Sequence, residues 1–168
     1  MNLVLIGYRG TGKSTVAQLL AKQLGMEVVS LDQEIVRHAE HTIPEIVAAH
    51  GWAHFRDLES EITKRCAARD HIIIDAGGGV ILRQENVEHL RRGGTLFWLR
   101  ASVPVIVARI AAGTERPALT AGKSFTEEVE DVLRARTPLY AAAAHHRVDT
   151  DTRTVEQVVA EIGRLFEG

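Results

Sequence analysis

A phosphate-binding signature lies near the amino terminus of the chain. Residues 7–14 read Gly-Tyr-Arg-Gly-Thr-Gly-Lys-Ser and match G-x-x-x-x-G-K-[ST] at every fixed position. Glycines in such a loop let backbone N–H groups surround phosphate oxygens, and the helix that follows directs the positive end of its dipole at them. The lysine reaches the terminal phosphates and the serine hydroxyl serves Mg²⁺. We therefore expect a nucleotide to bind through Gly7, Gly10, Thr11, Gly12, Lys13, Ser14 and Thr15.

Two other nucleotide-binding signals are weaker. A second Gly-Lys-Ser run at residues 122–124 lacks the first glycine and a preceding strand, so we interpret it as a loop in which Lys123 could contact phosphate. A small GTPase would also have a similar length. That class recognises guanine through Asn-Lys-x-Asp, however, and none of the four lysines has an aspartate two residues later. The GTPase class is therefore excluded.

The signature lies between elements of the kind that the motif requires. An apolar run at residues 2–6 predicts a buried strand, and helical spacing predicts a helix over 13–24. Further strands are expected at 27–31, 71–75, 95–99 and 147–150, with helical segments between them and a last helix from residue 155. This alternation predicts an α/β fold, a five-stranded parallel sheet flanked by helices on both faces. In such sheets ligands bind beyond the carboxyl ends of the strands.

Composition narrows the class of protein. The 168 residues are 45% hydrophobic and 25% charged, with a net charge of -2, which predicts one globular domain over residues 1–168. We expect no nucleic-acid or membrane partner, because the chain has neither a basic footprint nor an apolar run of about 20 residues. The amino terminus lacks a signal-peptide layout, so a cytoplasmic location is expected. We also expect the protein to be a monomer. Basic residues are divided unevenly, with 16 arginines and only four lysines. The single cysteine, Cys66, is expected to be a buried small hydrophobe.

Further motifs, in their order along the chain, make it resemble the shikimate kinase family over almost its whole length. They are Asp32-Gln-Glu-Ile35, Gly51 with Phe55-Arg56 and Glu59, Gly77–Gly79, Arg116-Pro-Ala-Leu119, and Arg136-Thr-Pro-Leu-Tyr140. The resemblance implies a P-loop kinase fold with a mobile lid at about 112–124 and a substrate-binding helical region at about 32–60. It also implies Mg²⁺-dependent transfer of the ATP γ-phosphate to the 3-hydroxyl of shikimate, a step of chorismate and aromatic amino acid biosynthesis.

The resemblance also implies roles for single residues. Arg56 and Arg136 would hold the substrate carboxylate, which suits the planar, two-pronged guanidinium group. The backbone of Gly77, Gly78 and Gly79 would approach the substrate ring. Asp32 would accept a hydrogen bond from the reacting hydroxyl and take its proton.

On the nucleotide side, the resemblance implies that Arg109 stacks on adenine. Arg116, in the lid, would stabilise the transferring phosphoryl group together with Lys13. Simpler interpretations stay open for several of these residues. Arg56 could merely pair with Glu59 on a helix surface, Arg136 and Arg116 could be solvated, and the three glycines could form an ordinary turn.

One departure from the family pattern concerns the metal. The family's second strand usually ends in Asp-x-Asp, whose first aspartate holds Mg²⁺ through water, but this chain has Ser30 there, two residues before Asp32. An alternative alignment, with Asp32 as the first acid and Glu34 as the second, fits the downstream residues less well. Asp75 follows an apolar run in the form typical of a magnesium-supporting strand end. Ser14 and Asp75 are therefore the expected metal residues, although Asp75 could instead cap the following turn.

Two rival functions remain at this stage. A related small-molecule kinase, for gluconate or a nucleotide, would share the phosphate loop and the lid but would not need Arg56 and Arg136. A degenerate, regulatory nucleotide-binding protein is favoured by Ser30 alone.

Overall fold

The computed structural model describes residues 1–110 and 124–168. Arg116, Lys123 and nearly all of the segment expected to form a lid therefore lie outside the described residues.

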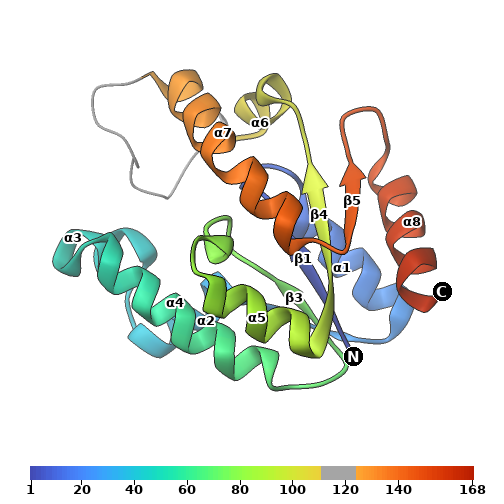
Figure 1. Ribbon diagram of the computed structural model, residues 1–168, viewed down its shortest axis with the longest axis horizontal. Coiled ribbons are helices and arrows are strands. Elements are labelled where there is room, and N and C mark those ends of the chain that lie inside the picture. Colours follow the sequence, from blue (N-terminus) through green and yellow to red (C-terminus); the bar gives the residue numbers. More distant parts are fainter. Residues whose placement is uncertain (111–123) are drawn as a thin grey trace.

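The central layer is a parallel sheet of five strands in the order β2-β3-β1-β4-β5 (Figure 1). Its strands are β1 (Asn2–Ile6), β2 (Glu27–Ser30), β3 (Ile72–Asp75), β4 (Gly94–Arg100) and β5 (His146–Asp149). The predicted α/β fold with a five-stranded parallel sheet is thus confirmed. In the register of β2 and β3, Ser30 lies opposite Asp75. The strand-end serine and the strand-end aspartate are consequently neighbours across the sheet.

The helices follow the expected alternation. They are α1 (Lys13–Leu24), α2 (Leu31–Ala39), α3 (Ile43–His50), α4 (Trp52–Ala67), α5 (Gln84–Gly93), α6 (Val103–Ile110), α7 (Phe125–Ala143) and α8 (Val155–Glu167), with a short 3₁₀ helix, η1 (Val80–Leu82). Helices α2, α3 and α4 follow one another between β2 and β3, and the two breaks between them have local causes. Thr42 and Glu45 form a capping box that starts α3, and Gly51, with φ of 86°, separates α3 from α4.

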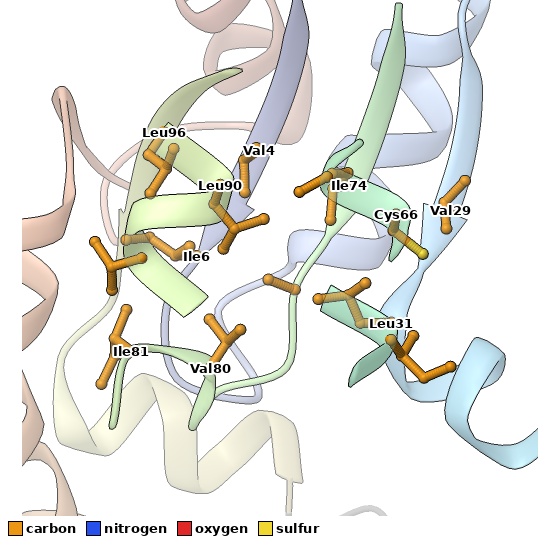
Figure 2. Packing of buried hydrophobic residues seen from close by; sticks show 14 of the residues in the cluster. Val4, Ile6, Val29, Leu31, Cys66, Ile74, Val80, Ile81, Leu90 and Leu96 are labelled. Atoms are coloured by element: carbon orange, nitrogen blue, oxygen red, sulfur yellow. The ribbon is translucent and has the colours of Figure 1, made fainter. Parts of the chain in front are cut away.

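Alternating side chains of the strands pack against different helices. Leu3, Leu5 and Phe97 face α1 and α8 on one side of the sheet. Val4, Ile6 and Ile74 belong to the larger cluster on the other side, which is completed by α2 to α5, η1 and α7 (Figure 2). The inner strands β1 and β3 are buried on both faces, which explains why their segments are almost continuously apolar. Cys66 lies in this larger cluster, as predicted, and burial raises the pKa of its thiol.

A third, smaller cluster joins the phosphate loop to two helices. Tyr8 packs there with Ile106 and Ile110 of α6 and with Val129 of α7. These two helices lie on either side of residues 111–123 in the sequence. The phosphate loop is therefore fastened to them by apolar contacts.

Within the described residues, no helix has both the length and the apolar character needed to span a bilayer.

His145 fastens the end of α7 to the sheet. Its Nδ1 accepts a hydrogen bond from the backbone N–H of Leu96 at 2.9 Å, and its own backbone N–H donates to the Leu96 carbonyl at 2.9 Å. Burial lowers the pKa of the imidazole, and the nearby Arg91 and His146 lower it further. Protonation of Nδ1 would remove the acceptor, so this contact requires the neutral ring.

This requirement predicts a pH dependence of stability. Because the pKa of His145 is lower in the folded chain than its usual value of 6.5, the unfolded chain takes up the proton first as the pH falls. Stability contributed by His145 is therefore complete above about pH 6.5 and is lost as the solution becomes more acidic. We expect His145→Asn, which keeps an acceptor oxygen but does not titrate, to show a shallower fall in melting temperature between about pH 7 and pH 5. Equal slopes in the two proteins would contradict this role.

Candidate active site

A cavity of about 360 Å³ opens at the carboxyl ends of β1, β2 and β3. Its walls include Gly10, Gly12, Lys13, Ser14, Thr15, Asp32, Asp75, Gly77, Gly78 and Arg109, which were all expected to be site residues. They come from four separate stretches of the chain. The edge of the sheet thus brings the phosphate loop together with the strand ends, as the parallel topology requires.

The phosphate loop is held in shape by its own side chains. Lys13 Nζ donates to the carbonyl oxygens of Gly7 at 2.8 Å and Tyr8 at 3.0 Å. Thr11 Oγ1 donates to the same Tyr8 carbonyl at 2.8 Å, and the side chain of Thr11 is buried. Gly7 and Thr11 therefore support the loop from within and are not among the residues that line the cavity. Helix α1 begins at Lys13, which directs its positive end at this cavity.

Ser14 and Asp75 face each other although 61 residues separate them. Ser14 Oγ donates to Asp75 Oδ2 at 2.7 Å. Burial raises the pKa of the Asp75 carboxyl, and the positive charge of Lys13 partly offsets this effect. The carboxylate thus contacts a phosphate-loop hydroxyl, which argues against the interpretation of Asp75 as a turn cap.

Ser30 has a different use. Its Oγ accepts a hydrogen bond from the backbone N–H of Gln33 at 3.3 Å and caps the amino end of α2. A serine in this position satisfies a helix terminus that an aspartate could satisfy equally well. Ser30 also lines the cavity, next to Asp75 on the neighbouring strand.

The donor atoms present fit a magnesium ion. Mg²⁺ prefers oxygen ligands and commonly keeps several waters, with only one or two protein carboxylates beside the substrate phosphates. Ser14 and Asp75 offer oxygen atoms of this kind beside the phosphate loop. Residues 1–110 and 124–168 contain no group of three or more His, Cys, Asp or Glu side chains that could enclose a metal, as a dedicated metal cage would.

The turn after β3 is closely surrounded by charged side chains. A Cβ atom at Gly77 would lie 2.9 Å from Asp32 Oδ1 and 3.1 Å from Glu59 Oε2. At Gly78 it would lie 3.5 Å from Arg136 Nη1, and at Gly79 it would collide with the guanidinium group of Arg56. This segment is therefore more than an ordinary turn, because the missing side chains of Gly77 and Gly79 make room for Asp32, Glu59 and Arg56, while Arg136 lies at van der Waals distance from the Gly78 position.

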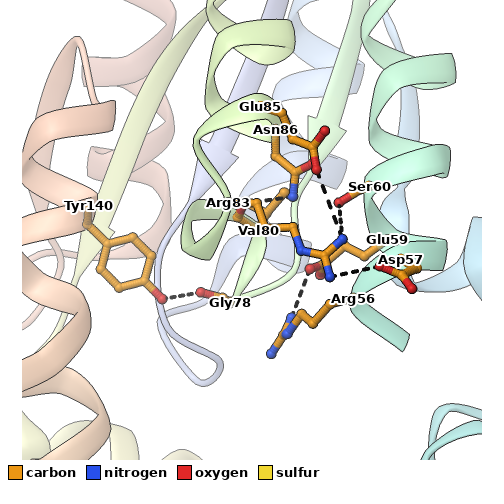
Figure 3. Close-up of polar contacts among 10 residues, drawn as sticks. All are labelled: Arg56, Asp57, Glu59, Ser60, Gly78, Val80, Arg83, Glu85, Asn86 and Tyr140. Carbon is orange, nitrogen blue, oxygen red and sulfur yellow. Dashed lines mark hydrogen bonds and ion pairs between the residues drawn. The ribbon is translucent and has the colours of Figure 1, made fainter. Parts of the chain in front are cut away.

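Arg56 reaches this turn from α4. Its Nη1 donates to Glu59 Oε1 at 2.8 Å (Figure 3). The pair was considered as a surface contact of the helix, but it lies inside, since the Glu59 side chain is 0% exposed and that of Arg56 is 12% exposed. The guanidinium carbon of Arg56 lies 5.5 Å from the centroid of the Trp52 ring and 5.1 Å from that of the Phe55 ring. An acid and two aromatic rings thus orient Arg56 toward Gly79.

Arg136 and Tyr140 reach the same turn from α7. Arg136 is 8% exposed, so the interpretation as a solvated helix arginine is wrong. The Tyr140 hydroxyl donates to the Gly78 carbonyl oxygen at 2.5 Å (Figure 3). Burial raises the pKa of Tyr140 to about 12, so it remains a donor at neutral pH. Tyr140 holds Gly78 beside Arg136.

Arg109, at the carboxyl end of α6, donates from Nη1 to the Gly10 carbonyl oxygen at 3.1 Å and lines the cavity. It therefore borders the phosphate loop, and its expected stacking on adenine stays a prediction. The structure adds two contributors that sequence reasoning missed. Arg9 lines the cavity from a variable position of the motif, where no pattern could single it out. Trp52 flanks the guanidinium group of Arg56, and its spacing of four residues from Arg56 on one helix was the available signal.

Comparisons with known proteins agree with this geometry. The shikimate kinase family model matches residues 9–167. A shikimate kinase from Nitratidesulfovibrio vulgaris is 45% identical over 165 residues, which cover 96% of this chain and 93% of the relative. One from Symbiobacterium thermophilum is 42% identical over 163 residues, covering 96% of this chain and 94% of the relative.

Solved structures agree as well. The structure of shikimate kinase from Acinetobacter baumannii in complex with shikimate superposes with a TM-score of 0.92 and 31% identity, covering 98% of this chain and 91% of that one. The chain therefore belongs to the shikimate kinase family, whose members are ATP-dependent kinases that phosphorylate shikimate.

Proposed function

We propose that this chain transfers the γ-phosphate of ATP to the 3-hydroxyl of shikimate at the cavity beside the phosphate loop. The observation that carries this proposal is the convergence of Asp32, Arg56 and Arg136 on the glycine turn of residues 77–79. A small cyclic acid needs cations for its carboxylate and an acceptor for its reacting hydroxyl. The turn presents both types of group next to the loop that binds phosphates.

On the acceptor side, Arg56 and Arg136 bind the substrate carboxylate through charge-assisted hydrogen bonds. Glu59 keeps Arg56 in place through its 2.8 Å contact. Asp32 accepts a hydrogen bond from the 3-hydroxyl and takes its proton as the oxygen attacks the γ-phosphorus. The backbone of Gly77–Gly79 approaches the ring because no side chain intervenes.

On the nucleotide side, the backbone of the phosphate loop and the ammonium group of Lys13 hold the phosphates. Arg109 borders adenine from α6, and Arg116 is proposed to stabilise the transferring group. Positive charge placed where negative charge develops is the main contribution that such a site makes to phosphoryl transfer. Lys13 supplies such a charge from the first residue of α1, beside the phosphate loop.

Mg²⁺ would be held by the hydroxyl of Ser14, with Asp75 supporting its water shell in place of the strand-end acid that Ser30 replaces. When bound, the ion neutralises charge on the ATP phosphates. Asp75 is suited to this role because it already accepts a hydrogen bond from Ser14. The monomeric state and the cytoplasmic location remain predictions.

The reaction is tested by ADP release, coupled to a spectroscopic readout, with shikimate as acceptor and with gluconate and nucleoside monophosphates as comparisons. We expect turnover with shikimate only. A nucleoside monophosphate has no carboxylate for Arg56 and Arg136, and gluconate, although a carboxylate, is an open chain that does not hold a hydroxyl rigidly at Asp32. Faster turnover with gluconate or a nucleotide would identify a related kinase. ATP binding without turnover of any acceptor would identify a degenerate nucleotide-binding protein.

Gly79→Ala tests the position of Arg56. Gly79 has φ of -99°, which alanine adopts readily, but the added Cβ displaces the Arg56 guanidinium. We expect the KM for shikimate to rise about 10- to 100-fold, the worth of charge-assisted hydrogen bonds to one group, while the KM for ATP changes little. Gly163→Ala in α8 is the matched control, since its Cβ also meets only the end of a flexible side chain, that of Gln23. An unchanged KM for shikimate in Gly79→Ala would contradict the role of Arg56.

The metal assignment predicts unequal effects at neighbouring strand ends. We expect Asp75→Ala to lower activity or apparent Mg²⁺ affinity about 10- to 100-fold, the usual range for residues that support a metal's ligands. Ser30→Ala should mainly cost about 1 kcal/mol of stability, because it removes a helix cap. Adding Ser30→Asp keeps the cap and supplies an acid across the sheet, so it should partly restore activity to Asp75→Ala. Small and equal effects of Asp75→Ala and Ser30→Ala on Mg²⁺ dependence would refute the assignment.

A further inference from the structure

Tyr8 occupies a variable position of the phosphate loop and is nevertheless buried, with 2% of its surface exposed. Its main chain belongs to the nucleotide site, because its carbonyl oxygen accepts hydrogen bonds from Lys13 Nζ at 3.0 Å and from Thr11 Oγ1 at 2.8 Å. The residue therefore cannot shift without moving the groups that hold the phosphates.

The side chain of Tyr8 contacts the proposed acceptor site. The guanidinium carbon of Arg136 lies 6.0 Å from the centroid of the Tyr8 ring, and that of Arg9 lies at 6.0 Å as well. These distances are at the edge of the range in which a cation is attracted to an aromatic ring. Gly78 lies next to both the acceptor site and the phosphate loop. A Cβ atom at Gly78 would be 3.5 Å from Arg136 Nη1, 3.5 Å from the Gly7 carbonyl oxygen and 3.6 Å from the backbone nitrogen of Arg9.

The same ring packs in the third apolar cluster, against Ile106, Ile110 and Val129. The fit between the phosphate loop and α6 is close, because a Cβ at Gly10 would lie 2.8 Å from Ile110 Cγ1. Tyr8 is thus connected at once to Lys13 through its main chain, to Arg136 through its ring, and to α6 and α7 through apolar packing.

We propose that the Tyr8 ring is a positioning residue that couples nucleotide binding at the phosphate loop to carboxylate binding at Arg136. When phosphates bind to the loop, they fix the main chain of Tyr8. The Tyr8 ring is then held in place beside the guanidinium group of Arg136. Coupling of this kind is reciprocal, so each substrate strengthens the binding of the other by the same factor. The inference rests on the proposed function, because it assigns Arg136 to the carboxylate of shikimate.

The hydroxyl of Tyr8 is not the coupling group in this proposal. It is buried and has no hydrogen-bond partner within the described residues. Phenylalanine offers a ring of the same shape and a similar attraction for cations. Tyr8→Phe therefore should preserve the coupling, whereas leucine or methionine, which pack but have no ring, should lose it.

The test is isothermal titration of shikimate into the full chain, with and without saturating Mg²⁺–ADP. In the unsubstituted protein we expect ADP to tighten shikimate binding at least about 5-fold, the lower end of typical coupling between sites. The ratio of the shikimate Kd without ADP to that with ADP measures the coupling. Tyr8→Phe should keep this ratio within about twofold of the unsubstituted protein's, and Tyr8→Leu should bring it close to 1. Affinity for ADP alone should change little, since the hydrogen bonds to the loop come from the main chain.

Two controls separate coupling from packing. Val129→Ala removes apolar packing beside the ring but keeps the ring itself and its position near Arg136, so it should leave the ratio unchanged. Tyr8→Met serves if Tyr8→Leu does not fold. A ratio retained in Tyr8→Leu or Tyr8→Met, or lost equally in Tyr8→Phe, would overturn the inference. A ratio of 1 in a protein that turns over shikimate would overturn the inference alone. Absence of both shikimate turnover and shikimate binding would overturn the proposed function and the inference with it.

Discussion

The site depends on the absence of side chains in the turn after β3. Charged groups removed from water are stable only when partners of opposite sign lie close to them. At Gly77 and Gly79, the space normally filled by Cβ atoms is taken by the carboxylates of Asp32 and Glu59 and by the guanidinium group of Arg56, and that of Arg136 lies at van der Waals distance from the Gly78 position. These four groups arrive from α2, α4 and α7. A larger residue in the turn would separate the charges that the fold has gathered there.

The charge of the whole chain conceals this arrangement. A net charge of -2 suggests no affinity for anions, yet the site has several cations within a small volume and is suited to a carboxylate and a polyphosphate. Arginine supplies most of them, and its planar group can be held by an acid and by aromatic rings at once. Arg56 shows both kinds of support, from Glu59 and from Trp52 and Phe55. Lysine, with its compact charge, is used where phosphates are expected.

The edge of a parallel sheet also explains how an acid at the end of β3 can do the work of one at the end of β2, as we propose for Asp75. Ser30 and Asp75 lie opposite each other on adjacent strands, so a carboxylate at either strand end faces the same cavity. The serine left on β2 retains a structural use as the cap of α2. In the proposed metal assignment, Asp75 supports Mg²⁺ from the end of β3, and the hydroxyl of Ser14, which contacts Asp75, still serves as the ligand from the phosphate loop.

From sequence alone, local patterns determined the phosphate loop, the order of the elements and the bounds of the strands to within one residue. Glycine spacing, apolar periodicity and caps act between residues that are close along the chain. Even so, β3 begins at Ile72 and not at residue 71, because His71 has φ of 58°. Only the tertiary structure decided that Arg136 and Glu59 are buried, that Ser14 meets Asp75, and that Tyr8 faces Arg136. These contacts join residues far apart in the chain, and burial depends on which helices cover them, which no local spacing encodes.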